Sequence, residues 1–339
     1  MKALVVEGPG KARIAERPEI SHSSTEAILQ VRMVGLCGTD LNTFRGRNAM
    51  VQFPRVLGHE IAATLLEPVT ASDGVELSAG THVTLSPYSA CGSCPSCRRG
   101  RFNACQSNQT LGVQRDGGLI ERLTVPVEKL YPASLSLREL CLVEPLTVGF
   151  HAAARGRVTA EDTVAVFGCG GVGLGAIAGS AARGARTIAI DLDDEKLEIA
   201  RKAGATDLIH SSREDLHTRL AEITDGNGPD CMIEAIGLPE TFRAAVEEVA
   251  FTGRVVYVGY TKEPVSYETR LFVQKELDIL GSRNALPEDF RAVIHMLEGK
   301  RFPVEDAISV VAPMEEAPSL LRQWSDNPAA FTKILIEVS

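Results

Sequence analysis

The sequence predicts an α/β fold of two domains, a mainly β domain and a doubly wound parallel sheet. The chain has 339 residues, of which 44% are hydrophobic, and this is enough for two packed cores. Short extended segments separated by Gly, Pro and Asp fill about the first 140 residues and predict strands at 1–6, 27–36, 82–88 and 120–126. From about residue 160, strand-like segments alternate with helical patterns, which is typical of consecutive β-α-β units.

Six apolar segments predict the strands of the parallel sheet. They cover residues 163–168, 186–192, 207–210, 230–237, 253–260 and 277–282. The helical patterns between them cover residues 172–185, 193–205, 214–224 and 240–250. Crossover helices of this kind cover both faces of an open sheet. A further helix is predicted at 287–300 and a closing strand at 333–339, which joins either the first domain or the second.

Composition excludes several classes of partner. The net charge is −9 and no run rich in Lys or Arg stands out, which disfavours nucleic acid and anionic membrane surfaces. No stretch of about 18 apolar residues is present, and residues 1–20 lack a basic segment leading into a long apolar one. We therefore expect a cytoplasmic protein whose partner is a small molecule, with no nucleic acid and no membrane.

The predicted strand at 163–168 runs directly into a G-x-G-x-x-G pattern that opens a helix. Gly168 allows a tight turn, Gly170 lets the backbone approach a pyrophosphate, and Gly173 lets the helix pack closely on the strand. The free N–H groups and the positive dipole end at the start of the helix attract phosphate. We predict a dinucleotide site formed by Gly168, Gly170, Gly171, Val172 and Gly173.

Asp191 ends the next predicted strand, 23 residues after Gly168. A carboxylate in this place accepts hydrogen bonds from ribose hydroxyls and repels a 2′-phosphate. Residues 192–194 supply no Arg that would pair with such a phosphate. We therefore predict NAD rather than NADP as the cofactor. Asp193 or Asp194 is interpreted as a helix N-cap and is left out of the site.

Cys91, Cys94, Cys97 and Cys105 have the spacing C-x2-C-x2-C-x7-C. Four thiolates from one short loop form a closed tetrahedral shell, which is typical of structural zinc in a reducing compartment. An iron–sulfur cluster also takes four cysteines, but ferredoxin-type runs have a different spacing and the chain shows no second electron-transfer feature. We predict that zinc stabilises this lobe, residues 88–108, and takes no part in the chemistry.

A second set of metal-binding residue types comes from distant segments. Cys37 lies in a CGTD segment, His59 and Glu60 lie in a GHE segment, and Glu144 precedes a proline. A thiolate, an imidazole and a carboxylate bind zinc while leaving one coordination place for water or substrate. Taken singly, each residue has an ordinary interpretation, since a lone Cys or His is usually a buried packing residue and a Glu before Pro marks a turn.

Other residues of these types are interpreted as packing. A helix predicted to begin near Thr147 places His151 on a packing surface. Cys141, Cys169 and Cys231 lie in apolar segments and are predicted to be small buried side chains. None of these four residues is assigned to a site.

In the order of its motifs the chain resembles the zinc-dependent medium-chain dehydrogenase/reductase family. Within that family it resembles the polyol branch of sorbitol and threonine dehydrogenases and the sugar-acid dehydrogenases. The resemblance covers nearly the whole chain, and its motifs lie at 37–40, 58–60, 91–105, 144–145 and 168–173. It implies a GroES-like catalytic domain from residues 1–146 and 285–339, with a Rossmann NAD-binding domain at 147–284 inserted between these segments.

The resemblance also implies the reaction, in which hydride passes from a secondary alcohol of a polyol or sugar acid to NAD. It implies a catalytic zinc held by Cys37, His59 and either Glu60 or Glu144, so that each subunit carries two zinc ions. Zinc makes an alkoxide accessible at neutral pH by lowering the pKa of an alcohol. Thr39 occupies the place of the family's relay hydroxyl. Asn42 stands where many relatives carry a His, so the path of the proton beyond Thr39 is left open.

The substrate and the assembly are less specified. Arg283 and Asn284 follow the last predicted strand of the parallel sheet, where open sheets place ligand-facing loops, and they are the predicted substrate residues. The segment 45–48 also resembles that of relatives acting on polyols and sugar acids. Threonine or broad-specificity alcohol dehydrogenation is the alternative activity, and a non-enzymatic zinc protein that senses NAD is a more distant one. The resemblance implies a homodimer or a homotetramer.

Overall fold

The computed structural model describes residues 1–20, 23, 25–71 and 74–339, and it divides into two compact units. The first unit comprises Met1–Glu144, Phe290–Gly299 and Val304–Ser339. The second unit comprises Pro145–Asp289 and Lys300–Pro303. The domain boundaries predicted from the sequence, 146/147 and 284/285, lie within a few residues of two of these divisions. Two helices, α2 (Leu137–Arg155) and α8 (Pro287–Glu298), each pass from one unit into the other.

The first unit is built mainly from strands. They are β1 (Lys2–Gly8), β2 (Lys11–Glu16), β3 (Glu26–Leu36), β4 (Arg55–Val56), β5 (Glu60–Leu65), β6 (Val69–Thr70), β7 (Glu76–Leu77), β8 (His82–Leu85), β9 (Arg122–Pro126), β10 (Leu130–Pro132), β17 (Val310–Pro313) and β18 (Ile334–Glu337). Its shorter helices are α1 (Gly38–Phe44), α9 (Val304–Ala307) and α10 (Ala317–Asp326). The largest sheet formed by the described residues has the order β10-β8-β5-β3-β18-β17, with β9 paired to β3.

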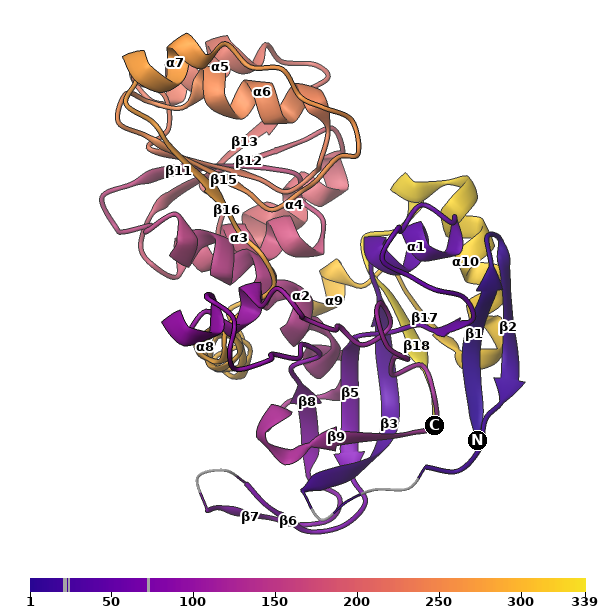
Figure 1. Cartoon of the computed structure of the whole chain (residues 1–339). Coiled ribbons are helices and arrows are strands. Elements are labelled where there is room, and N and C mark those ends of the chain that lie inside the picture. Colours follow the sequence, from indigo (N-terminus) through magenta and orange to yellow (C-terminus); the bar gives the residue numbers. More distant parts are fainter. Residues whose placement is uncertain (21–22, 24, 72–73) are drawn as a thin grey trace. The chain divides into compact units, whose positions relative to one another are not determined.

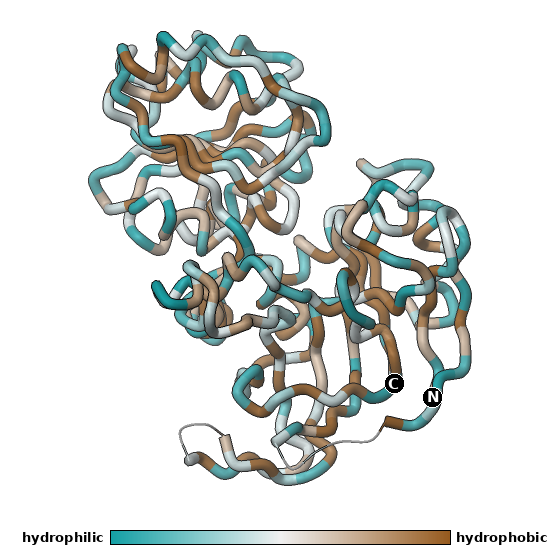
Figure 2. The backbone as a smooth tube through the Cα atoms, viewed as in Figure 1, coloured by the Kyte–Doolittle hydropathy of each residue, from teal (hydrophilic) through white to brown (hydrophobic). Residues whose placement is uncertain are grey.

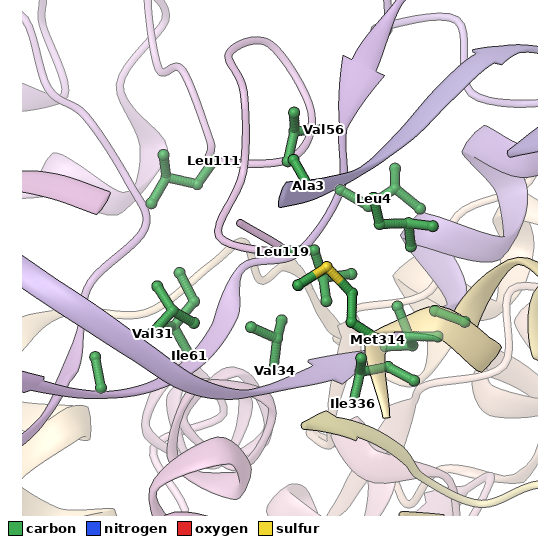
Figure 3. Packing of buried hydrophobic residues seen from close by; sticks show 14 of the residues in the cluster. Ala3, Leu4, Val31, Val34, Val56, Ile61, Leu111, Leu119, Met314 and Ile336 are labelled. Carbon is green, nitrogen blue, oxygen red and sulfur yellow. The ribbon is translucent and has the colours of Figure 1, made fainter. Parts of the chain in front are cut away.

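The strand β3 organises this sheet. It pairs antiparallel with β5 along one edge and with β9 and β18 along the other. Its residues alternate between half-buried and buried up to Met33 and are all buried from there on, so the end of β3 is covered on both faces. Val31 and Val34 pack with Leu4 of β1 and Ile336 of β18 in one continuous core (Figure 3). The closing strand therefore belongs to the first unit.

The second unit is a parallel sheet covered by helices on both faces. Its strands are β11 (Thr163–Phe167), β12 (Arg186–Asp191), β13 (Asp207–His210), β14 (Cys231–Glu234), β15 (Arg254–Tyr257) and β16 (Asp278–Gly281). Its helices are α3 (Gly171–Ala181), α4 (Asp194–Lys202), α5 (Leu216–Ile223), α6 (Pro239–Glu248) and α7 (Thr269–Gln274). Helices α3 and α4 cover one face, and α5, α6 and α7 cover the other (Figure 1).

The strand order of this sheet is β13-β12-β11-β14-β15-β16. The order reverses between β11 and β14, which is the arrangement of dinucleotide-binding Rossmann sheets. The strands run through the hydrophobic centre of the unit (Figure 2), where Ile188, Ile190, Met232 and Val255 are buried. The predicted α/β class, with a mainly β part and a doubly wound sheet, is confirmed.

The predicted start of one helix is wrong. A helix was expected near Thr147, but α2 begins at Leu137 and continues through Pro145. Proline removes one backbone hydrogen bond and usually ends a helix, which is why the Glu-Pro pair suggested a turn. In the structure Glu144 is a helical residue. No helix in the described part of the chain is long and apolar enough to cross a membrane.

Helices α2 and α3 approach closely at a glycine. A Cβ atom on Gly149 would lie 2.1 Å from the backbone N of Ala176 and 2.3 Å from the carbonyl O of Val172. We predict that Gly149→Ala destabilises the chain by roughly 1–3 kcal/mol, because backbone atoms cannot move aside as a flexible side chain can. Thermal unfolding measures this as a fall of several degrees in Tm.

The matched control is Gly8→Ala. A Cβ atom there would meet nothing within 4 Å. We expect the Tm of the control to stay near that of the native chain, since surface substitutions usually change stability by less than about 0.5 kcal/mol. Equal Tm values for the two variants would contradict the close approach of α2 and α3.

Candidate active site

The predicted zinc ligand Cys37 lies at the start of a helix. It is the N-cap residue of α1, and its sulfur accepts a hydrogen bond from the Thr39 N–H at 3.2 Å. Asp40 completes a capping box, because its carboxylate accepts the Cys37 N–H at 3.1 Å. The second Asp40 oxygen accepts the Gly58 N–H at 3.3 Å. Asp40 thereby connects the Cys37 segment with the segment that carries His59.

The GHE segment enters the site through a left-handed glycine. Gly58 has a φ of +97°, and a Cβ atom on it would lie 2.7 Å from the side chain of Val34. The buried His59 follows, and its Nε2 atom lies 3.1 Å from the Cys37 sulfur. Glu60 is the first residue of β5 and pairs with Gly35 of β3. The turn at Gly58 thus sets both candidate ligands beside Cys37.

Glu60 forms a buried ion pair with Lys333, the residue before β18. The Nζ atom of Lys333 lies 2.6 and 2.7 Å from the two Glu60 oxygens. Only 5% of the Lys333 side chain and none of the Glu60 side chain is exposed. Burial lowers the pKa of Lys333, but the Glu60 carboxylate and the Cys37 sulfur raise it, and the net direction is upward. Lys333 therefore remains charged.

Cys37, His59 and Glu60 form a candidate metal centre. One ligand atom from each residue lies within 4.8 Å of the other two. Burial lowers the pKa of His59, whereas Cys37 and Asp40 raise it, so that it lies well above its ordinary value. Surroundings this negative favour a cation. One thiolate, one imidazole and one carboxylate, with a fourth place open, are typical of catalytic zinc, so the residues present fit that ion.

Glu144, the other predicted carboxylate ligand, is not part of this three-residue group. It lies on α2 and accepts a hydrogen bond from the Tyr88 hydroxyl. Both side chains are buried. Burial raises the pKa of Glu144, and burial together with the Glu144 charge raises the pKa of Tyr88 well above its ordinary value. The Glu144 charge also raises the pKa of His59, so Glu144 belongs to the surroundings of the same centre.

Other predicted residues near the metal centre have mixed outcomes. Thr39 and Asn42 are half-buried on α1, and their roles in proton transfer stay predictions. Arg45 donates a hydrogen bond to the Ser325 hydroxyl of α10 at 3.1 Å, which ties α1 to α10. Asn48 donates to the Thr43 hydroxyl at 3.2 Å, within the same segment. These contacts give Arg45 and Asn48 structural roles.

The four-cysteine lobe brings its sulfur atoms together. The ligand atoms of Cys91, Cys94, Cys97 and Cys105 all lie within 4.8 Å of one another, and all four are free thiols. Hydrogen bonds from the Ser96 hydroxyl and from backbone N–H groups lower the pKa of Cys94 to about 5. Such donors favour the thiolate form of Cys94, and the thiolate is the form that binds zinc. The lobe therefore fits a closed structural site.

The glycine turn has the geometry that a pyrophosphate needs. Gly168 has a φ of +91°, and a Cβ atom on Gly173 would lie 1.7 Å from the Gly168 carbonyl oxygen. Gly170 is the N-cap of α3, and a Cβ atom there would meet nothing within 4 Å. A ligand can therefore approach the backbone at Gly170. The first N–H groups of α3, which include those of Gly171 and Val172, have no partner within the helix, so these residues fit a dinucleotide.

Asp191 takes part in the same turn. One of its oxygens accepts the Cys169 N–H at 2.7 Å, and the other accepts the N–H groups of Leu192 and Asp193 at 2.8 and 3.2 Å. A carboxylate oxygen can accept two hydrogen bonds, so the oxygen that meets the Cys169 N–H retains capacity for a ribose hydroxyl. Asp193 is the N-cap of α4, as predicted, because it accepts the Lys196 N–H at 3.1 Å.

The remaining predicted residues lie in the second unit or in the interior. Arg283 and Asn284 follow β16, and their contact with substrate stays a prediction. The Nδ1 atom of His151 lies 2.9 Å from a carboxylate oxygen of Asp289, and both side chains are buried, so His151 belongs to a buried polar pair. The cysteines interpreted as packing residues, Cys141, Cys169 and Cys231, are fully buried.

Three site residues were missed by the sequence analysis. Tyr88 is the first residue of the four-cysteine lobe, and an isolated Tyr after Pro has no distinguishing pattern. Lys333 precedes an apolar strand, where a Lys usually marks a solvated strand end. Asp40 could have been assigned, because Asp at the third position after a helix N-cap is a capping signal.

Comparisons with known proteins agree with this geometry. The zinc-binding dehydrogenase family model matches residues 171–299, and the alcohol dehydrogenase GroES-like domain model matches residues 23–135. The chain is 33% identical over 302 residues to L-galactonate-5-dehydrogenase of Escherichia coli (strain K12), covering 88% of each protein. It is 33% identical over 289 residues to sorbitol dehydrogenase of Bacillus subtilis (strain 168), covering 83% of this chain and 81% of that protein.

A solved structure gives the same result for the fold. A short chain alcohol dehydrogenase of Escherichia coli CFT073, in complex with NADH, superimposes with a TM-score of 0.90 and 28% sequence identity. The similarity covers 99% of both chains. Because the candidate metal centre, the four-cysteine lobe and the glycine turn occur in one chain with these matches, the protein belongs to the zinc-dependent medium-chain dehydrogenase/reductase family.

Proposed function

We propose that this enzyme oxidises a secondary hydroxyl group of a polyol or sugar acid with NAD as the hydride acceptor. The observation that carries the proposal is the meeting of Cys37, His59 and Glu60 within 4.8 Å in the first unit. The L-galactonate-5-dehydrogenase and sorbitol dehydrogenase relatives support the substrate class. Catalysis by these three residues requires a small-molecule alcohol that reaches the fourth, open coordination position of the metal ion.

Cys37, His59 and Glu60 would hold the catalytic zinc, and Cys91, Cys94, Cys97 and Cys105 would hold a structural one. When bound, zinc supplies Lewis acidity toward an alcohol and the nicotinamide supplies a hydride acceptor. Two zinc ions per subunit follow. Thiolate ligands of this kind persist in a reducing compartment, so we propose a cytoplasmic location.

The residues around the metal centre would transfer the substrate proton and orient the second carboxylate. Thr39, two residues after Cys37, would accept the hydroxyl proton of the substrate and pass it outward. Asn42 cannot hold a proton, so water or the ribose hydroxyls would carry it to solvent. The Tyr88 hydroxyl donates a hydrogen bond to Glu144 and keeps that carboxylate oriented beside the centre. Glu144 is therefore the second carboxylate of the site rather than the resting ligand.

The coenzyme would bind to the second unit through backbone groups and one carboxylate. The N–H groups at Gly170 and Gly171 would receive the pyrophosphate, and Asp191 would accept the ribose hydroxyls. The carboxylate supports NAD over NADP, since a 2′-phosphate would meet its charge. Arg283 and Asn284 are the proposed substrate-recognition residues of this unit.

Steady-state kinetics test the function. We expect saturation by sorbitol-type polyols or by aldonates, with kcat/KM for NAD at least about tenfold above that for NADP. Ethanol and threonine serve as the comparison substrates. Saturation by short primary alcohols alone, or by threonine alone, would replace the proposed substrate class with an alternative one. No turnover with any alcohol would support a non-enzymatic protein that senses NAD.

The two metal sites are predicted to respond differently to loss of a ligand. Cys37→Ser should lower kcat/KM by more than about 100-fold while the chain stays folded, because the catalytic ion loses its thiolate. Cys97→Ser should lower Tm by several degrees and reduce activity only secondarily. Metal analysis should find two zinc ions in the native chain and one in each variant. A Cys37→Ser variant with native turnover would exclude this residue from the centre.

We also propose a homo-oligomer that pairs through the edge of the parallel sheet. The strand β16 ends the sheet, its Ile279 is 39% exposed, and Val273 of the neighbouring helix α7 is 82% exposed. Exposed apolar edges of this kind are normally covered. Light scattering should give two or four times the chain mass, and Ile279→Lys should reduce it. A native monomer would contradict the proposal.

A further inference from the structure

Lys333, the buried partner of Glu60, has no part in the reaction described so far. Lys333 donates to both Glu60 oxygens, at 2.6 and 2.7 Å, and to the Leu36 carbonyl oxygen at 3.2 Å. Glu60 is at the same time one of the three residues whose ligand atoms meet within 4.8 Å. One carboxylate thus faces a permanent cation and a candidate metal centre.

The backbone makes this double contact possible. The strand β3 lies between β5 and β18, and Gly35 pairs with Glu60 on one side and with Leu335 on the other. A Cβ atom on Gly35 would lie 2.0 Å from a Glu60 oxygen. The missing side chain leaves the space in which the Glu60 carboxylate lies, so that Lys333 reaches it across β3.

We propose that Lys333 is a positioning residue for the reaction. Lys333 shares the Glu60 carboxylate with the metal ion and so keeps Glu60 a weak, exchangeable metal ligand. The inference rests on the proposed function, because it assumes a metal at Cys37, His59 and Glu60. A carboxylate whose charge is partly neutralised by an ammonium group donates less strongly to a metal ion. A weaker anionic ligand leaves the ion a better Lewis acid.

The direction of the effect separates this role from a structural one. The thiolate of Cys37 and the carboxylates of Asp40, Glu60 and Glu144 make the surroundings negative, and Lys333 opposes them. Removing its charge should therefore tighten the metal and slow the reaction. If Lys333 only fastened β18 to β3 through the Leu36 carbonyl, its removal would loosen the centre and release the metal sooner.

The experiment uses the full-length chain loaded with ¹¹³Cd at both sites and challenged with EDTA. Cadmium bound by four thiolates and cadmium bound by one thiolate with N and O donors give separate NMR resonances. The four-cysteine resonance therefore serves as an internal reference. The variants are Lys333→Met, Lys333→Gln, Glu60→Gln and the double variant Lys333→Met with Glu60→Gln. Lys333→Gln and the double variant keep the test available if an unpaired Glu60 prevents Lys333→Met from folding.

Lys2→Met is the matched control. Lys2 also forms an ion pair, with Glu315 at 3.0 Å, but both side chains are about half exposed or more, at 49% and 61%. This control should leave both resonances and their loss rates unchanged. It separates the loss of a buried lysine beside the metal centre from the loss of any paired lysine.

We expect the catalytic-site resonance of Lys333→Met and Lys333→Gln to be lost at least about tenfold more slowly than in the native chain, with a lower kcat for the zinc form. The Glu60→Gln variant should lose the catalytic-site resonance faster than the native chain does. The double variant should match Glu60→Gln within about twofold, because Lys333 acts through the Glu60 charge.

Three results would overturn the inference. Faster or unchanged metal release from the Lys333 variants would leave only a structural role. A Lys333 effect of the same size when residue 60 is Gln would show that it does not act through this carboxylate. A native chain with only the four-cysteine resonance would refute both the proposed centre and this inference. If both cadmium resonances are present and the variants change the metal-loss rates as expected, but the chain turns over no alcohol, only the proposed function is refuted.

Discussion

The active site depends on placing several charges inside a β domain and giving them partners there. An ion buried without a partner costs several kcal/mol, so each buried charge must be matched locally. The Asp40 carboxylate accepts two backbone N–H groups, the Glu60 carboxylate meets Lys333, and the Glu144 carboxylate meets Tyr88. These pairings hold the Cys37 and His59 side chains in a strongly anionic pocket. The donor set of such a pocket suits a divalent cation.

The two metal sites achieve this in different ways. The four-cysteine lobe takes all its ligands from residues 91–105, and neighbouring N–H and hydroxyl donors stabilise the thiolates. Its geometry is therefore local. The catalytic set joins Cys37 with a segment 22 residues away, and its counter-ion Lys333 is 273 residues from Glu60. Its geometry depends on the register of β5, β3 and β18, so any change in that sheet reaches the metal centre.

This difference explains what could be predicted from the sequence. The glycine turn and the four-cysteine lobe follow from local spacing, since each is formed by neighbouring residues, and the parallel sheet follows from the alternation of strand and helix patterns along the chain. The ligands Cys37, His59 and Glu60 were found because they lie in short motifs. Lys333 and Tyr88 act only through distant partners, so no local pattern marks them. The start of α2 was misplaced because Pro145 is tolerated inside that helix, where the boundary between the two units falls.

Asp191 shows a further consequence of building sites from shared groups. Its carboxylate accepts three backbone N–H groups from the glycine turn and from the start of α4, so it organises the turn before any coenzyme is bound. The same oxygens are those proposed to accept the ribose hydroxyls. Replacing Asp191 by a smaller residue therefore removes a coenzyme contact and three turn contacts together. A change of coenzyme preference in this scaffold requires new partners for these N–H groups as well as a cation for the 2′-phosphate.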